Sequence, residues 1–171
     1  MDNCEYCGLL QRDWQIVASS EDVVIAVKDK VAVLGQITIF PKEHFTIMEL
    51  VPEPVLQQCL ILANKASTAI FETLGSQGTN VLIRNGLGAG QDVPHFGIEV
   101  IPRKEDDGLN LRWEPRPLSE DEIEMTQQAL LSAIFEAEKG RQAQHNQGAD
   151  KPILQEKGRT NYLIKSLRRR A

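Results

Sequence analysis

Four side chains in this sequence have the types and spacing of a metal-binding set. Cys4 and Cys7 are separated by two residues, so a single turn of chain can direct both sulfurs toward one point. A tetrahedral zinc ion needs two further ligands, commonly histidines, and the chain contains three histidines. His44 and His95 lie next to predicted strands, whereas His145 lies in a polar segment and is given no role. The set Cys4, Cys7, His44 and His95 is complete for zinc, although a lone CxxC pair is also typical of redox thiols.

A second feature with chemical potential is the glycine-rich segment 85–91, which reads Asn-Gly-Leu-Gly-Ala-Gly-Gln. Glycines allow backbone N–H groups to approach an anion closely, as they do in phosphate-binding loops. The segment does not match the GxxxxGK[ST] pattern of a P-loop, so a flexible hairpin loop is the competing interpretation.

Hydrophobic patterns predict the elements that must position these residues. Short β-branched or alternating runs typical of strands occur at 22–28, 35–40, 79–84 and 95–101. We expect the first two to pair as antiparallel neighbours and Pro102 to end the last one. The arrangement of strands around a helix favours an α+β domain over a βαβ repeat.

Two helices are predicted from apolar residues at three- and four-residue spacing. The first begins at Pro52 or Pro54 and ends at Gly75, with Cys59 on its apolar face as a core residue rather than a reactive thiol. The second begins at a capping box formed by Ser119 and Glu122 and ends near residue 140.

The composition is that of an ordinary globular protein, with 171 residues of which 42% are hydrophobic and 25% charged. The sequence shows no signal-peptide pattern and no apolar run of membrane-spanning length, so we expect a cytoplasmic protein. The net charge of −5 offers no general attraction to nucleic acid. Residues 157–171, however, contain six basic residues and no acidic one, which could contact a phosphate backbone unless they form a solvated terminus.

Taken in order, several segments resemble the histidine triad (HIT) superfamily of nucleotide hydrolases and transferases. The matching segments are Cys4-Glu-Tyr-Cys7, Ile39-Phe-Pro-Lys-Glu-His44, Asn80, the run 85–95 and Val100-Ile-Pro-Arg103. The resemblance implies a five-stranded antiparallel sheet with two helices, usually dimerised. It also implies that Cys4, Cys7, His44 and His95 bind a structural zinc ion, because zinc-containing members use these positions. We therefore expect a HIT-like domain over 1–114, a helix over 115–141 packed on it, and a linker with a basic tail over 142–171.

The resemblance also assigns nucleotide-binding positions. Asp29 looks like the acid that binds the ribose hydroxyls, and Asn85 and Gln91 match polar positions near the phosphates. Asp92 replaces a residue that usually carries a hydroxyl group. Asp29 and Asn85 also favour turns, so turn formation is the competing interpretation for both.

The sequence departs from the family at its catalytic motif, which alternates three histidines with apolar residues. Here the three positions are His95, Gly97 and Glu99. The middle histidine of the family attacks the α-phosphate and is nucleotidylated, and glycine has no side chain that can do so. The carboxylate of Glu99 repels a phosphate unless it is protonated or paired. The expected nucleotide-binding set is Asp29, Asn85, Gln91, Asp92, Gly97 and Glu99.

The leading hypothesis is a zinc-binding, HIT-like homodimer that binds a nucleotide or nucleotide-like ligand without ordinary nucleotidylation, since losing the nucleophile costs several orders of magnitude in rate. The first alternative is an active dinucleoside polyphosphate hydrolase or phosphorylase in which Glu99 or Asp92 activates another nucleophile. The second is a non-catalytic interaction module that uses its basic tail, with nucleic acid as one partner.

Overall fold

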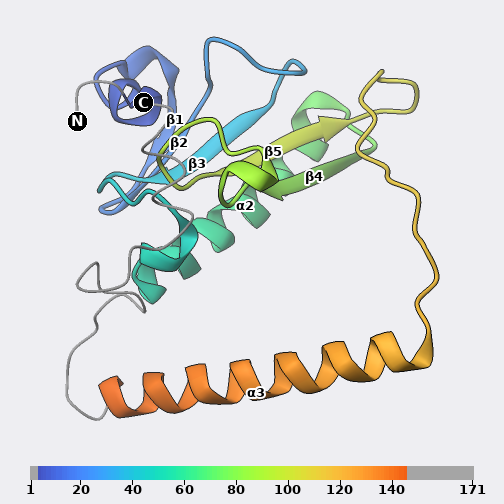
Figure 1. Cartoon of the computed structure of the whole chain (residues 1–171). Coiled ribbons are helices and arrows are strands. Elements are labelled where there is room, and N and C mark those ends of the chain that lie inside the picture. The colour runs from blue at the N-terminus through green and yellow to red at the C-terminus, as the bar shows by residue number, and fades with distance from the viewer. Residues whose placement is uncertain (1–3, 146–171) are drawn as a thin grey trace.

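The computed structural model describes residues 4–145, which contain a five-stranded antiparallel sheet of order β1-β2-β3-β5-β4 (Figure 1). The elements in chain order are α1 (Glu5–Leu9), β1 (Ile16–Ser19), β2 (Val23–Ala26), β3 (Ile37–Pro41), α2 (Glu53–Leu74), β4 (Gly78–Ile83), β5 (Ile98–Arg103) and α3 (Glu120–His145). Short 3-10 turns occur at Asp13–Gln15, Met48–Leu50 and Leu87–Ala89. The α+β class and the five-stranded sheet expected from the sequence are confirmed.

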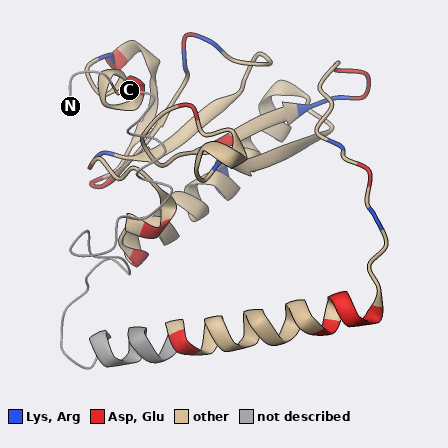
Figure 2. Ribbon diagram, in the orientation of Figure 1, with Lys and Arg blue, Asp and Glu red and all other residues tan. Residues whose placement is uncertain are grey.

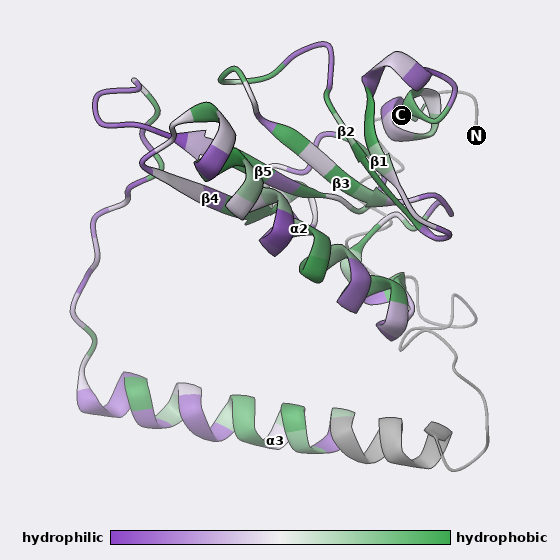
Figure 3. Ribbon diagram, turned by 180° about the vertical axis from the view of Figure 1, so that it is seen from behind, coloured by the Kyte–Doolittle hydropathy of each residue, from purple (hydrophilic) through white to green (hydrophobic). Residues whose placement is uncertain are grey.

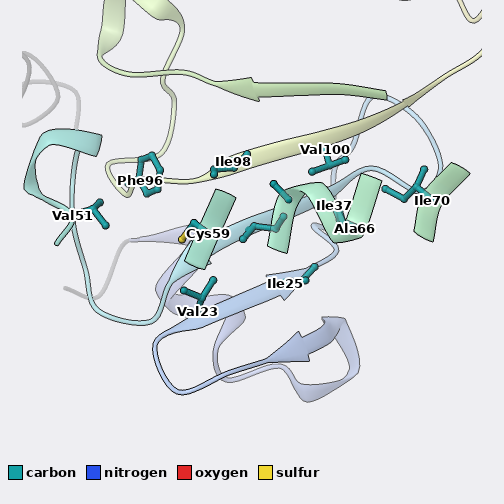
Figure 4. Close-up of a cluster of buried hydrophobic side chains, with 12 residues drawn as sticks. Val23, Ile25, Ile37, Val51, Cys59, Ala66, Ile70, Phe96, Ile98 and Val100 are labelled. Atoms are coloured by element: carbon teal, nitrogen blue, oxygen red, sulfur yellow. The ribbon is translucent and has the colours of Figure 1, made fainter. Parts of the chain in front are cut away.

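The continuous apolar run of β2 is explained by cover on both faces of the sheet. Val23 and Ile25 pack into the core beneath α2, whereas Val24 and Ala26 pack against α1 on the opposite face. Alternate side chains of a strand point to opposite faces, so both sets are buried and the strand reads as uniformly apolar. Figure 4 shows the larger core, in which α2 lies across the sheet.

Helix α2 forms as its sequence predicts. Pro52 precedes it, Pro54 lies in its first turn, and Gly75 ends it with a left-handed φ of 58°. Cys59 is fully buried in the core that this helix covers, as expected (Figure 4). Burial raises the pKa of the Cys59 thiol to about 12, so this side chain behaves as an apolar residue.

The last strand differs from its prediction at both ends. The alternating run suggested a strand over 95–101, but β5 begins at Ile98 and ends at Arg103. The segment before β5 runs beside the loop after β3 instead, where the N–H of Phe96 donates to the carbonyl of Phe45 at 2.6 Å. Pro102 is tolerated in β5 because pairing with β3 ends at Val100, which leaves β5 open on that side.

The edge strand β1 is not among the strand segments predicted from the sequence. It is short, and Val17, Ala18 and Ser19 are exposed, so no apolar face marks it in the sequence. Within residues 4–145 no helix is both long and apolar enough to cross a membrane.

Helix α3 begins with the predicted capping box, because the N–H of Glu122 donates to the Ser119 hydroxyl at 3.2 Å and the Glu122 carboxylate accepts from the N–H of Ser119 at 2.9 Å. Its acidic first turn is visible in Figure 2, and the helix runs to His145 rather than ending near Gly140. Hydrophobic positions recur along the ribbon of α3 in Figure 3, and in this single chain the side chains of Ile123, Leu130 and Ile134 are exposed. The packing expected for 115–141 stays a prediction. The basic tail follows residue 145 and lies outside the described residues.

Candidate functional site

The structure brings the side chains of Cys4, Cys7, His44 and His95 together, with ligand atoms all within 4.8 Å of one another. Cys4 precedes α1 and Cys7 lies in it, while the two histidines come from the loops after β3 and before β5. The sulfur of Cys7 lies 3.3 Å from Nδ1 of His44 and 3.6 Å from Nδ1 of His95, and the sulfur of Cys4 lies 3.5 Å from Nδ1 of His95. The cluster therefore joins the N-terminal segment to the loops that follow β3 and precede β5.

The geometry of this cluster fits a tetrahedral metal ion. With metal–sulfur and metal–nitrogen bonds of about 2.3 and 2.0 Å, a tetrahedron separates sulfur from nitrogen by about 3.5 Å, close to the three separations above. Nε2 of His95 lies 3.0 Å from the carbonyl oxygen of Pro41. A carbonyl can only accept, so Nε2 carries the proton and Nδ1 presents its lone pair to the cluster.

The electrostatics of the cluster agree with such a role. Burial, together with the neighbouring His44, lowers the pKa of His95 to about 4, so the imidazole is neutral, as a metal ligand must be. Burial and the adjacent Cys4 raise the pKa of Cys7 to about 11, because a lone thiolate there lacks compensation. A bound cation would supply that compensation.

The ring of Tyr6 occupies the space beside the Cα atom of Gly97. A Cβ atom built on Gly97 would lie 2.6 Å from Cε2 and 3.4 Å from Cζ of Tyr6, and 3.4 Å from Cγ2 of Thr38. Tyr6 is buried, and its ring stacks on Phe40 with the centroids 4.9 Å apart. Position 97 therefore has no room for a histidine while Tyr6 stays in place.

Glu99 is buried, with 3% of its surface exposed, and is tied to three donors. Nζ of Lys28 donates to Oε1 and Nε2 of Gln36 donates to Oε2, each at 2.5 Å, and the Tyr6 hydroxyl donates to Oε1 at 3.3 Å. The expected repulsion between Glu99 and a phosphate is therefore offset by Lys28. A carboxylate engaged in this way is poorly placed to take a proton from an attacking water. Burial and the nearby Glu99 raise the pKa of Tyr6, so its hydroxyl stays protonated.

A cavity of about 50 Å³ lies beside Gly97. It is lined by Tyr6, Lys28, Arg84, Gln91, Asp92, Val93, His95, Gly97 and Glu99. A pocket of this volume accommodates a few water molecules or a polar group of a ligand. Of the six positions expected to bind a nucleotide, four line the cavity: Gln91, Asp92, Gly97 and Glu99.

Gln91 and Asn85 hold the glycine turn in place. The side-chain amide of Gln91 donates to the carbonyls of Thr46 and Val93 and accepts from the N–H of Gly86 at 2.7 Å. Asn85 accepts from the N–H of Met48 at 3.0 Å and donates to both oxygens of the Glu49 carboxylate. Both amides are engaged within the protein, and Asn85 does not line the cavity.

Asp29 also lies outside the cavity lining. Its carboxylate pairs with the guanidinium of Arg12 at 2.6 Å and accepts from Nε2 of Gln15 at 3.1 Å. Both members of the ion pair are about half exposed, so a ligand could displace Arg12.

Sequence reasoning missed Tyr6, Lys28, Gln36 and Arg84. Tyr6 lies within the CxxC pair, and Lys28 ends the first predicted strand next to Asp29, but neither position indicates which residue it contacts in the fold. Lys28 and Gln36 are 71 and 63 residues from Glu99, so these contacts depend on strand pairing. The one available signal was Glu99 itself, because a carboxylate in an apolar strand requires a partner.

The five-stranded sheet and the Cys–His cluster define a HIT-type α+β domain. A sequence model of the HIT domain matches residues 10–106, more than half of the chain, so the protein belongs to the HIT family.

Known proteins agree with this assignment. The adenosine 5′-monophosphoramidase hnt1 of Schizosaccharomyces pombe is 30% identical over 139 residues, covering 77% of this chain and 98% of that protein. A HIT family protein from Bacillus subtilis superposes with a TM-score of 0.69 at 23% identity, over 76% of this chain and 96% of its own. A zinc-bound histidine triad family protein from Mycobacterium smegmatis superposes with a TM-score of 0.59 at 23% identity, over 67% and 85% of the two chains.

Proposed function

We propose that this chain is a zinc-stabilised HIT protein that binds a nucleotide or nucleotide-like ligand and does not carry out the family's nucleotidylation. The observation that carries the proposal is the ring of Tyr6 at the position that a side chain on Gly97 would occupy. The nucleophile is missing and its space is filled. The remaining acid of the motif, Glu99, is held by Lys28 and Gln36.

Nucleotide binding is supported by family membership and by the cavity beside Gly97. The S. pombe relative is named as an adenosine 5′-monophosphoramidase, an activity that requires binding of an adenosine monophosphoryl group. The polar lining of the cavity, which includes Arg84 and Asp92, can orient a ligand of this kind.

Zinc is the ion that best suits two thiolates and two imidazoles at tetrahedral spacing. Four protein ligands leave no open coordination position for water, so the ion would be structural. It would connect α1, and with it Tyr6, to the loops that carry His44 and His95. The zinc-bound M. smegmatis protein of similar fold is consistent with this assignment.

One observation favours an enzymatic alternative. The carboxylate of Asp92 is exposed on the cavity and has no hydrogen-bond or ion-pair partner among residues 4–145. It could accept a proton from water attacking a bound phosphoryl compound. Glu99, the other acid considered, lacks this freedom because of its three donors.

The experiment that separates these functions combines binding with turnover on the full chain. Isothermal calorimetry with AMP and GMP should give binding, while chromatography of incubations with diadenosine polyphosphates and adenosine phosphoramidate should give no product. Turnover that disappears in Asp92→Asn would establish the enzyme instead. Absence of binding at millimolar nucleotide, with folded and metal-loaded protein, would leave the interaction module as the remaining function.

We also propose a homodimer. Strand β4 forms an edge of the sheet, and Val81 on it is 49% exposed, while α3 exposes Leu130 and Ile134. Apolar side chains on an open edge and an uncovered helix are normally buried by association. Sedimentation equilibrium should give twice the mass of the chain, and a monomer at micromolar concentration would contradict the proposal.

A further inference from the structure

Some polar groups around the cavity beside Gly97 are already bonded within the protein, whereas others are available to a ligand. Glu99 is bonded to Lys28, Gln36 and Tyr6, and the amide of Gln91 is bonded to backbone atoms. In the described part of the chain, two charged side chains on the cavity have no partner, and these are Arg84 and Asp92. Any charged group of a ligand must therefore be recognised chiefly by this pair.

Arg84 is well placed to act as an anchor. It directly follows β4 and is half-buried, and the adjacent Asn85 is held by Met48 and Glu49. A Cβ atom at Gly90 would lie 3.6 Å from Cδ of Arg84, so the glycine turn runs alongside the stem of this side chain. A guanidinium on so restrained a stem is pre-organised for a phosphate.

The charge balance of the cavity limits how much negative charge it can accept. Lys28 already neutralises Glu99, so one cation, Arg84, remains against the free carboxylate of Asp92. One phosphate can pair with Arg84, whereas further phosphates would meet the like charge of Asp92.

We infer that Arg84 anchors a single phosphate group and that Asp92 excludes longer chains, so the site selects a nucleoside monophosphate over nucleoside triphosphates and dinucleoside polyphosphates. This inference rests on the proposed nucleotide binding and adds the class of ligand and the residues that choose it. Arg84 attracts the first phosphate and Asp92 repels further ones, so this selection needs no histidine side chain at position 97.

The test is a double-mutant-type cycle in which the charge of Arg84 is removed from the protein and the phosphate is removed from the ligand. Calorimetry on the zinc-loaded full chain compares adenosine with AMP and ATP, and guanosine with GMP and GTP, for the wild type and Arg84→Met. The wild type should bind the monophosphate about tenfold or more tightly than the nucleoside, and also more tightly than the triphosphate. Arg84→Met should remove the advantage of the monophosphate and leave nucleoside binding unchanged. Arg84→Lys should retain part of it.

Control variants distinguish the specific effect of Arg84 and Asp92 from a general effect of net charge on nucleotide binding. Lys65→Met removes one positive charge from the exposed face of α2 and should leave every affinity unchanged. Asp92→Asn should strengthen triphosphate binding relative to monophosphate binding. An unchanged ratio of monophosphate to nucleoside affinity in Arg84→Met would overturn the inference while leaving nucleotide binding intact. A wild type that binds neither nucleoside nor nucleotide would instead refute the proposed function, and this inference with it.

Discussion

The ring of Tyr6 approaches Gly97 so closely that a Cβ atom at position 97 would lie 2.6 Å from Cε2. Tyr6 lies between the two cysteines of the Cys–His cluster, and its hydroxyl donates a hydrogen bond to Glu99. The N-terminal segment thus connects this cluster with the segment that contains Gly97 and Glu99. We therefore expect that one substitution at position 97 cannot introduce a working nucleophile, because the ring of Tyr6 occupies the space that the new side chain would need.

Gly97→Ala should destabilise the protein by about 1–3 kcal/mol, because the new methyl group overlaps a buried aromatic ring. Gly97→His should destabilise it further and should not generate nucleotidylated protein. Urea unfolding measures the first effect, and mass spectrometry after incubation with diadenosine polyphosphates measures the second. Gly78→Ala is the control, because a Cβ there has no atom within 4 Å and its φ is not positive. Equal stability of Gly97→Ala and wild type would show that Tyr6 yields readily.

Glu99→Gln should lower the free energy of unfolding by about 3 kcal/mol, since it leaves the mostly buried ammonium group of Lys28 without its counter-charge. Lys28→Met should also lower the free energy of unfolding, because it leaves the buried carboxylate of Glu99 without its counter-charge. The double variant should lose less stability than the sum of the two single losses. A double-mutant cycle by urea unfolding measures this coupling. If Glu99 instead served as a general base, Glu99→Gln would abolish turnover and leave stability nearly unchanged.

Those parts of the fold with strong local patterns could be predicted from the sequence. Helix α2 has a long apolar stripe bounded by Pro52 and Gly75, and in the structure the helix begins after Pro52 and ends before Gly75. Strand β1 lacks a buried face and gave no comparable pattern. At His95 the alternation typical of a strand misled the prediction, because the chain there follows the loop containing Phe45 before β5 begins.

The candidate site was predictable where residue type alone restricts the chemistry. Two cysteines and two histidines suggested a cluster, and the structure brings these four side chains together. Whether they hold zinc stays a prediction. The roles of Tyr6 and Lys28 could not be predicted, because both depend on which residues tertiary packing places beside Gly97 and Glu99.

Loss of the metal should destabilise the whole domain. Cys4→Ser, or treatment of the wild type with a strong chelator, should reduce bound zinc from one ion per chain to much less. The free energy of unfolding should fall by at least about 3 kcal/mol, a decrease of about 6–12 °C in Tm. Metal analysis and thermal unfolding measure the two effects. Cys59→Ala is the control, because it removes a cysteine from the core beneath α2 and should retain the zinc. Wild-type protein that is equally stable with and without chelator would contradict a structural ion.

The pairing of Asp29 with Arg12 allows the predicted ribose contact to be tested separately from turn formation. Arg12→Ala should cost less than about 1 kcal/mol of stability, because both side chains are about half exposed, and it should leave AMP binding equal or tighter by freeing the carboxylate. Asp29→Ala should weaken AMP binding about tenfold, because it removes a charged acceptor for the ribose hydroxyls. Calorimetry with 2′-deoxy-AMP provides the ligand-side control, since the wild type should bind it more weakly than AMP while Asp29→Ala should not distinguish the two. If Asp29→Ala binds AMP as the wild type does, the carboxylate serves only its contacts with Arg12 and Gln15.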